Sequence, residues 1–187
     1  MKMDINMLSQ YGMTESEIHF TLGSYEPEAV KANHFFLREG MVSNKIAFIV
    51  SGLLRSCFYD GDGNEITSRF FEQGSLIISL ESFNNRTPSK ENIVAVIDSD
   101  LMTITYEKQK ALYENIPAWN QVCKDLADRA SDEMISRALQ FQTLTAKQRY
   151  EKLCSEHTDI IKHTPLRHIA SYIGIDNATL SRIRRKK

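Results

Sequence analysis

Short apolar runs separated by glycines fill the sequence from about residue 30 to residue 106, and they restrict its fold more than any other feature. Seven runs have the length of a β-strand and are rich in β-branched or aromatic residues: HFFLREG, KIAFIVSG, LLRSCFY, EITSRFF, SLIISL, NIVAVID and LMTITY. The glycines that fall between them are Gly40, Gly52, Gly61, Gly63 and Gly74. Short strands at this spacing predict an antiparallel sandwich, roll or barrel.

The segment DGDGNE between two of these runs begins like a calcium-binding loop, because Asp60, Asp62 and Asn64 occupy alternate positions. However, Glu65 stands where such a loop needs glycine, and Phe71 stands where it needs a bidentate glutamate. Glycines between two strands are typical of a tight hairpin. We therefore predict a hairpin turn, with calcium binding as the less favoured alternative.

A long helix is predicted after the strands. Pro117 suits the first position of a helix, and no glycine or proline interrupts the sequence before Pro165. Apolar residues recur at steps of three or four, namely Trp119, Cys123, Leu126, Ala130, Met134, Ala138 and Phe141. A helix over residues 117–141 would be about 37 Å long, which is more than a small sheet domain needs for its own cover. We predict that this stripe is the seam of a homodimer; the alternative is a helix that packs only on its own domain.

Two capping boxes predict further helices. Thr14 is followed three residues later by Glu17, which predicts a short helix near the start of the sequence. Thr145 and Gln148 repeat the pattern and predict another helix after the long one.

The segment TPLRHIASYIGIDNATLSRIRRKK predicts a helix-turn-helix. Thr164 suits an N-cap and Pro165 suits the first helical position. Gly174 can take the positive φ that a sharp turn requires, and Asp176 or Asn177 can cap the second helix. The apolar residues that would hold the two helices together are Ile169, Ile173, Ile175, Leu180 and Ile183.

In a helix-turn-helix the second helix lies in the major groove of DNA, with its N-terminal residues at the base edges. The predicted DNA contacts are Thr164, Asn177, Ala178, Thr179, Ser181, Arg182, Arg185 and Lys186. Arg182 can bind guanine in a bidentate manner, and Asn177 can pair with adenine or with a phosphate. Lys186 suits the phosphate backbone, where positive charge acts regardless of sequence. The alternative is a helical hairpin that serves protein contact.

Charge is distributed unevenly along the sequence. Residues 145–187 hold ten Lys or Arg against four Asp or Glu, a balance of +6. The other 144 residues hold thirteen against twenty, a balance of −7, so the formal net charge is only −1. A basic segment on an acidic body is typical of a protein that meets a polyanion.

Cellular location is indicated by what the composition lacks. The three cysteines, Cys57, Cys123 and Cys154, are odd in number and far apart, which argues against a disulfide framework and suits a reducing cytoplasm. No stretch approaches the roughly 20 consecutive apolar residues of a transmembrane helix. The start, MKMDINMLSQYG, lacks the apolar core and cleavage site of a signal peptide. We therefore expect a cytoplasmic protein with no membrane partner.

The order of these parts resembles the Crp/Fnr family of bacterial transcription regulators, from about residue 28 onward. The stretch FIVSGLLRSCFYDGDGNEITSRFFEQGSLI resembles the sensor roll of that family in spacing and texture. The stretch IASYIGIDNATLSRIRRK is similar to its DNA-reading segment nearly residue by residue. The resemblance implies a homodimer joined along the 117–141 helix that binds a two-fold symmetric DNA site, with RNA polymerase as a further candidate partner.

The complete prediction is an α+β protein with three parts. Residues 1–115 form an antiparallel β-roll of the jelly-roll type with a short N-terminal helix, 116–142 form a long dimerisation helix, and 143–187 form a helix-turn-helix domain. The family usually continues into a β-hairpin wing after the recognition helix. The present sequence stops at Lys187, so little or no wing is expected.

The sensor segment departs from the cyclic-nucleotide-binding members of the family. Those members carry a Gly-Glu turn that holds the ribose and an Arg-Ser or Arg-Thr pair that holds the phosphate. Here Ile78 and Ser79 occupy the first two positions, Ser89 and Lys90 occupy the second two, and Arg86 lies three residues early. The resemblance therefore implies a pocket around these five residues, an unknown effector, and a protein that is not controlled by cyclic AMP.

Two rival interpretations remain at the level of the sequence. Metal-dependent oxygenases use similar rolls, but they need closely spaced histidine and carboxylate ligands, and only His34 lies among the predicted strands. We therefore expect neither an enzyme nor a bound metal or cofactor. The second rival is a cyclic-nucleotide-binding-like module that acts through protein–protein contacts without sequence-specific DNA binding.

Overall fold

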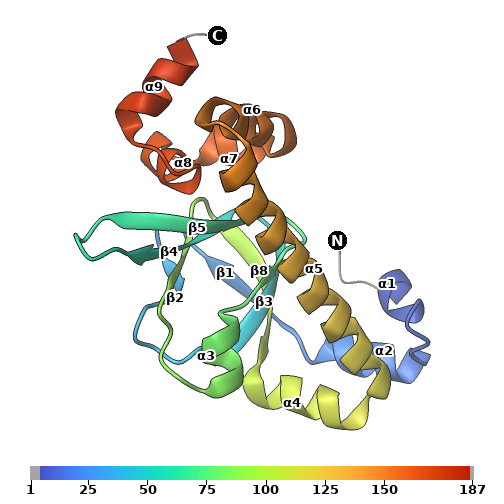
Figure 1. The fold of residues 1–187 in the computed structure, drawn as a ribbon. Helices are drawn as coiled ribbons and strands as arrows, with labels where there is room; N and C mark the ends of the chain where they lie inside the picture. Colours follow the sequence, from blue (N-terminus) through green and yellow to red (C-terminus); the bar gives the residue numbers. More distant parts are fainter. Residues whose placement is uncertain (1–4, 186–187) are drawn as a thin grey trace.

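The computed structural model describes residues 5–185. The strands are β1 (Glu26–Val30), β2 (Phe35–Leu37), β3 (Lys45–Ser51), β4 (Leu54–Tyr59), β5 (Glu65–Phe71), β6 (Leu76–Ile77), β7 (Asn92–Ala95) and β8 (Ser99–Thr105). The helices are α1 (Ile5–Ser9), α2 (Glu15–Gly23), α3 (Leu80–Asn85), α4 (Tyr106–Asn115), α5 (Pro117–Thr143), α6 (Ala146–Glu156), α7 (Thr158–His163), α8 (Leu166–Tyr172) and α9 (Asn177–Arg185). Figure 1 shows the strands gathered into a roll, with α5 running alongside it toward α6–α9.

The roll consists of two four-stranded sheets, in the orders β1-β8-β3-β6 and β2-β7-β4-β5. Each strand pair in both sheets is antiparallel. Apolar side chains from the two sheets form a core between them, in which Leu54, Ile77 and Ile93 are fully buried. The antiparallel roll predicted from the glycine-bounded runs is confirmed.

The DGDGNE segment forms the predicted hairpin between β4 and β5. The strands pair from Leu54 opposite Phe71 to Tyr59 opposite Glu65. The Asp60 carboxylate accepts hydrogen bonds from the backbone N–H groups of Asp62 (2.9 Å) and Asn64 (2.8 Å). Its oxygens are thus used to close a turn.

One local prediction was wrong, and other elements were missed. The run SLIISL was expected to be one strand, but β6 covers only Leu76–Ile77 and is followed by α3. Strand β1 and helix α4 were not predicted. Strand β1 (EPEAV) lacks a β-branched run, and Pro27 is tolerated because β1 is an edge strand that pairs only with β8.

Both predicted capping boxes are present. Thr14 Oγ1 accepts a hydrogen bond from the Glu17 N–H (3.3 Å), and Glu17 Oε2 accepts one from the Thr14 N–H (2.7 Å). Thr145 and Gln148 exchange the same pair of bonds at the start of α6. These reciprocal bonds fix the first residues of α2 and α6.

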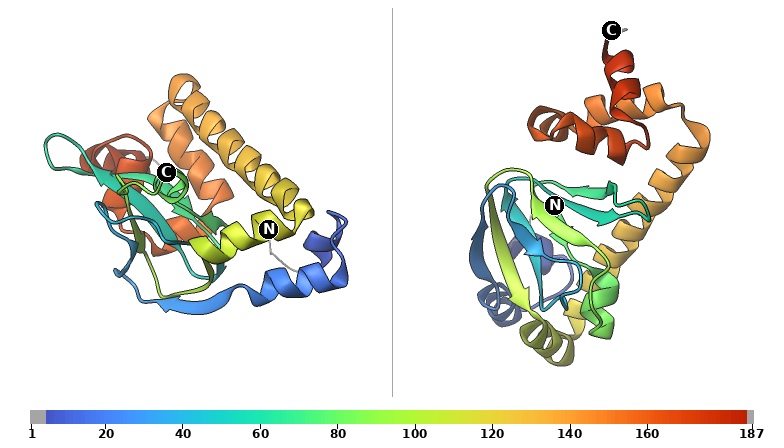
Figure 2. Two further views of the ribbon diagram at one scale, coloured as in Figure 1. Left: turned by 90° about the horizontal axis from the view of Figure 1, so that it is seen from below. Right: turned by 90° about the vertical axis from the view of Figure 1, so that its left-hand side faces the viewer.

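The molecule has two further cores. One packs α1, α2, α4 and the first turns of α5 against the outer face of the β1-β8-β3 sheet, and Leu8, Leu112 and Trp119 lie at its centre. The other joins α6–α9, and it includes Leu53 from the turn between β3 and β4. Figure 2 shows α5 linking these two regions from one end of the roll to the other. Within the described range, none of the helices combines the length and the apolar character needed to cross a membrane.

Candidate nucleic-acid interface and ligand cavity

Helices α8 and α9 form the predicted helix-turn-helix. Ile169 and Ala170 of α8 are buried, and the chain reverses at Gly174, which has φ +71°. The Ile175 N–H donates to the Ala170 carbonyl (3.0 Å) and closes the turn. Asp176 caps α9, because its Oδ1 accepts a hydrogen bond from the Thr179 N–H (2.7 Å).

One face of α9 is left open. Leu180 is buried against the helical core, which turns the opposite side of the helix outward. The fully exposed residues on that side are Asn177, Ala178, Ser181, Arg182 and Arg185. Arg182 lies along its own helix, where Nη2 donates to Thr179 Oγ1 (2.9 Å). Helix α9 therefore presents small polar residues and guanidinium groups on one surface.

Two of the predicted DNA contacts need comment. Thr164 was expected to cap the first helix of the motif, but α8 begins at Leu166, and Thr164 ends α7 instead. Its side chain is only 6% exposed, so its hydroxyl is not available to a phosphate and the prediction for Thr164 is wrong. Lys186 lies outside the described residues.

Replacement of Gly174 by alanine is expected to destabilise the helical domain. A left-handed backbone costs an L-residue about 1–2 kcal/mol, and a Cβ here would lie 2.7 Å from Phe141 Cε1. The matched control is Gly63→Ala, because Gly63 has φ +80° but no atom within 4 Å of an added Cβ. Thermal unfolding should therefore show a larger loss for Gly174→Ala than for Gly63→Ala. Equal losses would mean that contact with Phe141 is unimportant.

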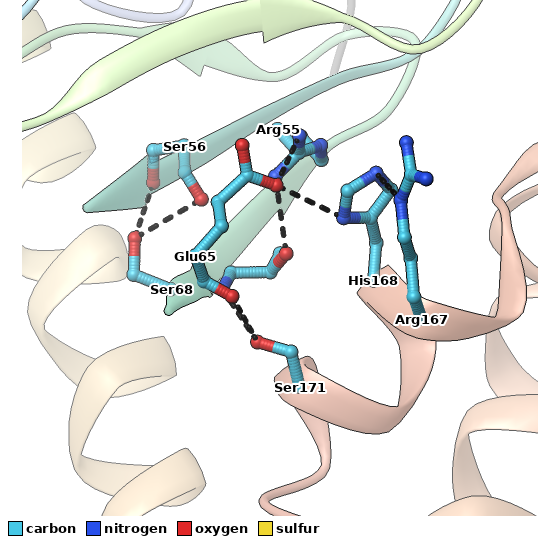
Figure 3. Close-up of polar contacts among 8 residues, drawn as sticks. Arg55, Ser56, Glu65, Ser68, Arg167, His168 and Ser171 are labelled. Atoms are coloured by element: carbon cyan, nitrogen blue, oxygen red, sulfur yellow. Dashed lines mark hydrogen bonds and ion pairs between the residues drawn. The ribbon is translucent and has the colours of Figure 1, made fainter. Parts of the chain in front are cut away.

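The helix-turn-helix docks on strand β5 through its first helix. Ser171 of α8 accepts a hydrogen bond from the Thr67 N–H (2.8 Å) and donates to the Glu65 carbonyl (3.3 Å). The Glu65 carboxylate lies 2.7 Å from Arg55 Nη2 and 3.1 Å from His168 Nδ1. Figure 3 shows these groups between β4, β5 and α8.

His168 is held neutral in this interface. Arg167 Nε donates a hydrogen bond to His168 Nε2 (3.2 Å), so Nε2 is an acceptor and the ring proton is on Nδ1, facing Glu65. Burial, which is the largest cause, and the charges of Arg55 and Arg167 together lower the pKa of His168 to about 4, although Glu65 opposes them. A proton added to Nε2 would point at the Arg167 guanidinium.

His168 should make stability depend on pH in a defined window. Its pKa is about 4 in the folded protein and about 6.5 in an unfolded chain, so the unfolded state binds more protons between these values. The free energy of unfolding should therefore fall as pH decreases from about 6.5 toward about 4. His168→Gln should flatten this part of the profile relative to wild type. Parallel profiles in urea titrations at several pH values would contradict the assignment.

Further contacts join the helical domain to the roll. Arg137 of α5 donates to the carbonyl oxygens of Ser68 and Tyr172, and its guanidinium lies 3.7 Å from the Tyr172 ring centre. Phe70 meets Tyr172 edge to face at 4.9 Å between ring centres. His157 Nδ1 lies 2.6 Å from Glu72 Oε2, and this contact raises the pKa of His157.

A cavity of about 1150 Å³ lies between the roll and α5. Four of the five residues predicted for a ligand pocket line it, namely Ile78, Ser79, Ser89 and Lys90. Arg86 does not line it. The Arg86 guanidinium donates to the carbonyl oxygen of Ser43 (2.7 Å) and lies over the Tyr106 ring, so its prediction as a pocket residue is wrong.

Sequence comparison with the family pattern overlooked Arg69, which does line the cavity. Its guanidinium lies over the Phe71 ring at 4.4 Å. The signal was available, because side chains alternate along a strand and Phe71 is an obvious core residue two positions away. Lys90 also lines the cavity, but its side chain is 80% exposed and is paired with Glu81 at 2.8 Å.

The predicted dimer stripe divides into two parts. Trp119 is only 1% exposed and lies in the core between helices α1, α2, α4 and α5 and the outer face of the β1-β8-β3 sheet, so it has no surface left for a partner, and its assignment to the seam is wrong. Cys123 and Leu126 are half-buried against the same core, and Ala130 lines the cavity.

Beyond Ala130 the apolar side chains of α5 are open to solvent. Met134, Ala138 and Phe141 of the predicted stripe are exposed there. Ile135 (59% exposed) and Leu139 (52%) lie beside them and were not included in the prediction. The C-terminal half of α5 therefore carries a run of exposed apolar side chains.

Metal binding has no support in the described part of the chain, where residues 5–185 contain no group of three His, Cys, Asp or Glu side chains that could hold an ion.

An antiparallel roll, a long helix and a helix-turn-helix define the fold of Crp/Fnr-type regulators. The c-di-GMP-responsive global regulator CLP of Xanthomonas campestris superimposes with a TM-score of 0.72 and 15% identity, over 92% of this chain and 91% of that chain. A Crp/Fnr-family regulator from Eubacterium rectale gives 0.72 and 18% identity, over 95% and 84%. FixK2 from Bradyrhizobium japonicum gives 0.71 and 18% identity, over 87% and 83%.

Residues 27–115, which contain the roll, match the family model of the cyclic nucleotide-binding domain. No curated protein matches the sequence significantly. The similarity to the solved structures, at these identities, is a similarity of fold.

Proposed function

We propose that the protein is a cytoplasmic, non-enzymatic transcription regulator that binds a two-fold symmetric DNA site as a homodimer. The open face of α9 carries this proposal. It combines Asn177, Ser181 and Arg182, whose side chains can read base edges, with Arg185 at the end that suits a phosphate. The basic balance of residues 145–187 supplies the electrostatic attraction that any DNA sequence would feel.

Dimerisation is proposed through the outer half of α5. The surface is formed by Met134, Ile135, Ala138 and Leu139, and it replaces the longer stripe expected from the sequence. Two copies of this helix packed side by side would cover the exposed apolar groups and place two α9 helices on one side of the assembly. A two-fold symmetric protein requires a DNA site with matching symmetry.

Cyclic AMP is not the proposed effector. A cyclic phosphate in a roll needs cations and donors around its oxygens. At the matching positions Ile78 and Ser79 replace the glycine and glutamate, while the only cation, Lys90, is engaged with Glu81 at the surface. Calorimetric titration with cyclic AMP should give no binding tighter than millimolar. A micromolar isotherm would reverse this part of the proposal.

The DNA-binding proposal is tested by selecting binding sites from random duplex DNA and measuring affinity by gel shift. The expected product is an inverted repeat that is bound far more tightly than unrelated duplex of the same length. The logarithm of the association constant should fall linearly with the logarithm of salt concentration. Enrichment of no sequence, or equal affinity for all duplexes, would favour the protein-interaction module instead.

A further inference from the structure

Arg69 is a cation without an anionic partner inside the cavity wall. Among residues 5–185, its only hydrogen bond runs from Nη2 to the Ile78 carbonyl (3.2 Å), and no carboxylate lies within salt-bridge distance of it. A guanidinium has five N–H donors, so most of the donors of Arg69 remain available. Glu91 and Glu133 are near enough to act electrostatically, but neither pairs with it.

Hydroxyl groups line the same cavity. Ser56 and Ser68 lie with their oxygens 2.6 Å apart, and Ser79 and Ser89 lie with theirs 3.2 Å apart. Ser68 Oγ donates to the Ser56 carbonyl (3.3 Å) and Ser89 Oγ donates to the Glu91 carbonyl (2.8 Å), and these hydroxyls can rotate to donate to an anion instead. Together with Arg69 they form the set of donors that carboxylates and phosphates require.

The rest of the cavity is largely apolar. Ile46, Phe48, Leu76 and Phe83 contribute to its wall. A cavity of about 1150 Å³ is at the upper end of the range for small-molecule sites, which typically enclose about 300–1,000 Å³. It is therefore large enough for an organic molecule with an apolar body as well as a charged group.

Three deeply buried side chains on the cavity wall have polar atoms with no partner. These atoms are Tyr25 Oη, Gln109 Oε1 and Trp119 Nε1, and each of the three residues is at most 5% exposed. A buried polar atom without a partner costs about 1–3 kcal/mol. A polar group on a bound molecule would relieve this cost.

We propose, building on the regulator proposed above, that its effector is a small organic anion with a largely apolar body, whose carboxylate or phosphate pairs with Arg69. The apolar body occupies the space between the roll and α5. The cationic anchor is thus a residue of strand β5, and the position of the phosphate-binding arginine in cyclic-nucleotide-binding relatives contributes only the Ser89 hydroxyl.

The probe for this site is 8-anilinonaphthalene-1-sulfonate, an apolar anion whose fluorescence rises in a dry pocket. Wild-type protein should bind it, and octanoate or octyl phosphate should displace it. Octanol, which has the same chain without the charge, should displace it at least tenfold less well. Comparison of octanoate with octyl phosphate then decides which anionic group the site prefers.

Variants connect the binding to Arg69. Arg69→Gln should weaken probe binding at least tenfold, whereas Arg69→Lys should recover part of the loss because it restores the charge. Lys31→Gln is the matched control, because Lys31 is an exposed cation that is paired with Asp98 at 2.7 Å and does not line the cavity, and this variant should change binding less than twofold. Circular dichroism and thermal unfolding should show that each variant is folded.

Several outcomes would overturn the inference. They are equal displacement by octanol, unchanged probe binding in folded Arg69→Gln, or an equal loss in Lys31→Gln. DNA binding is measured separately on the same preparations. Protein that binds DNA but no anion contradicts the effector class alone, and protein that binds the anion but no DNA contradicts the regulator proposal alone.

Discussion

Replacing Arg182 with alanine is expected to lower the affinity for the selected DNA site by about 5- to 150-fold for each copy of α9. This loss is equivalent to about 1–3 kcal/mol for a lost bidentate base contact. The reason is position: Arg182 lies on the exposed face of α9, one turn after Ala178. Its guanidinium donates a hydrogen bond to Thr179 of the same helix. Arg182 can exchange this hydrogen bond for one to a base edge at little cost in free energy.

The measurement is a gel-shift titration against the selected site and against single-base variants of it. If Arg182 reads a base, Arg182→Ala should lose affinity for the selected site and lose discrimination at one position of each half-site. Arg38→Ala is the control, because Arg38 is an exposed arginine of the roll, stacked on Phe35 and far from α9. Uniform weakening for every duplex would move Arg182 to the phosphate-contacting class.

The substitution Leu139→Glu is expected to convert the proposed dimer into a monomer. In the proposed assembly this side chain would be desolvated, and a buried charge without a partner costs about 3–5 kcal/mol. The dimer dissociation constant should rise by roughly two to three orders of magnitude, since 1.4 kcal/mol is a factor of ten. Because the dimer is two-fold symmetric, the substitution is present in both subunits, which further raises the dissociation constant.

Sedimentation at micromolar concentration separates the two states. Met41→Glu is the matched control, because Met41 is also an exposed apolar residue (61%, against 52% for Leu139) and lies in the loop between β2 and β3. Leu139→Glu should be folded and monomeric, while Met41→Glu should be dimeric. A folded, dimeric Leu139→Glu protein would show that the seam lies elsewhere. DNA affinity should fall with the dimer, since one half-site offers only half of the contacts.

The roll and the helix-turn-helix could be predicted because their signals are local. Glycine-bounded apolar runs determine where strands begin and end, and Gly174 with Asp176 determines the turn between two helices. Strand β1 escaped prediction because its conformation depends on pairing with β8, about 70 residues later in the sequence. The run SLIISL was misread because β-branched texture alone does not reveal that a helix starts at Leu80.

The cavity was harder to predict for a different reason. Alignment with a family pattern directed attention to Arg86 and Lys90, since these are the cations nearest to the expected cassette in sequence. Lys90 does line the cavity, but so does Arg69, which reaches it from β5. Likewise, periodicity grouped Trp119 with Met134 as one stripe, although the first is covered by the roll and the second is open. Which part of a helix is covered depends on tertiary packing, and the stripe alone does not contain that information.

The position of Leu53 restricts how proteins with this architecture can diversify. Leu53 lies in the turn between strands β3 and β4 of the roll, yet it is buried in the core shared by α6–α9. The hydrophobic core of the helical domain is therefore completed by a residue of the roll. The two halves are therefore not interchangeable modules. A chimera that joined residues 143–187 to an unrelated sensor domain would have a cavity in the core of α6–α9 where Leu53 lies, unless that sensor domain supplied a similar side chain. New specificities in this architecture should accordingly arise by changes on the surface of α9 or inside the cavity, within an intact pair of domains, more readily than by shuffling of whole domains.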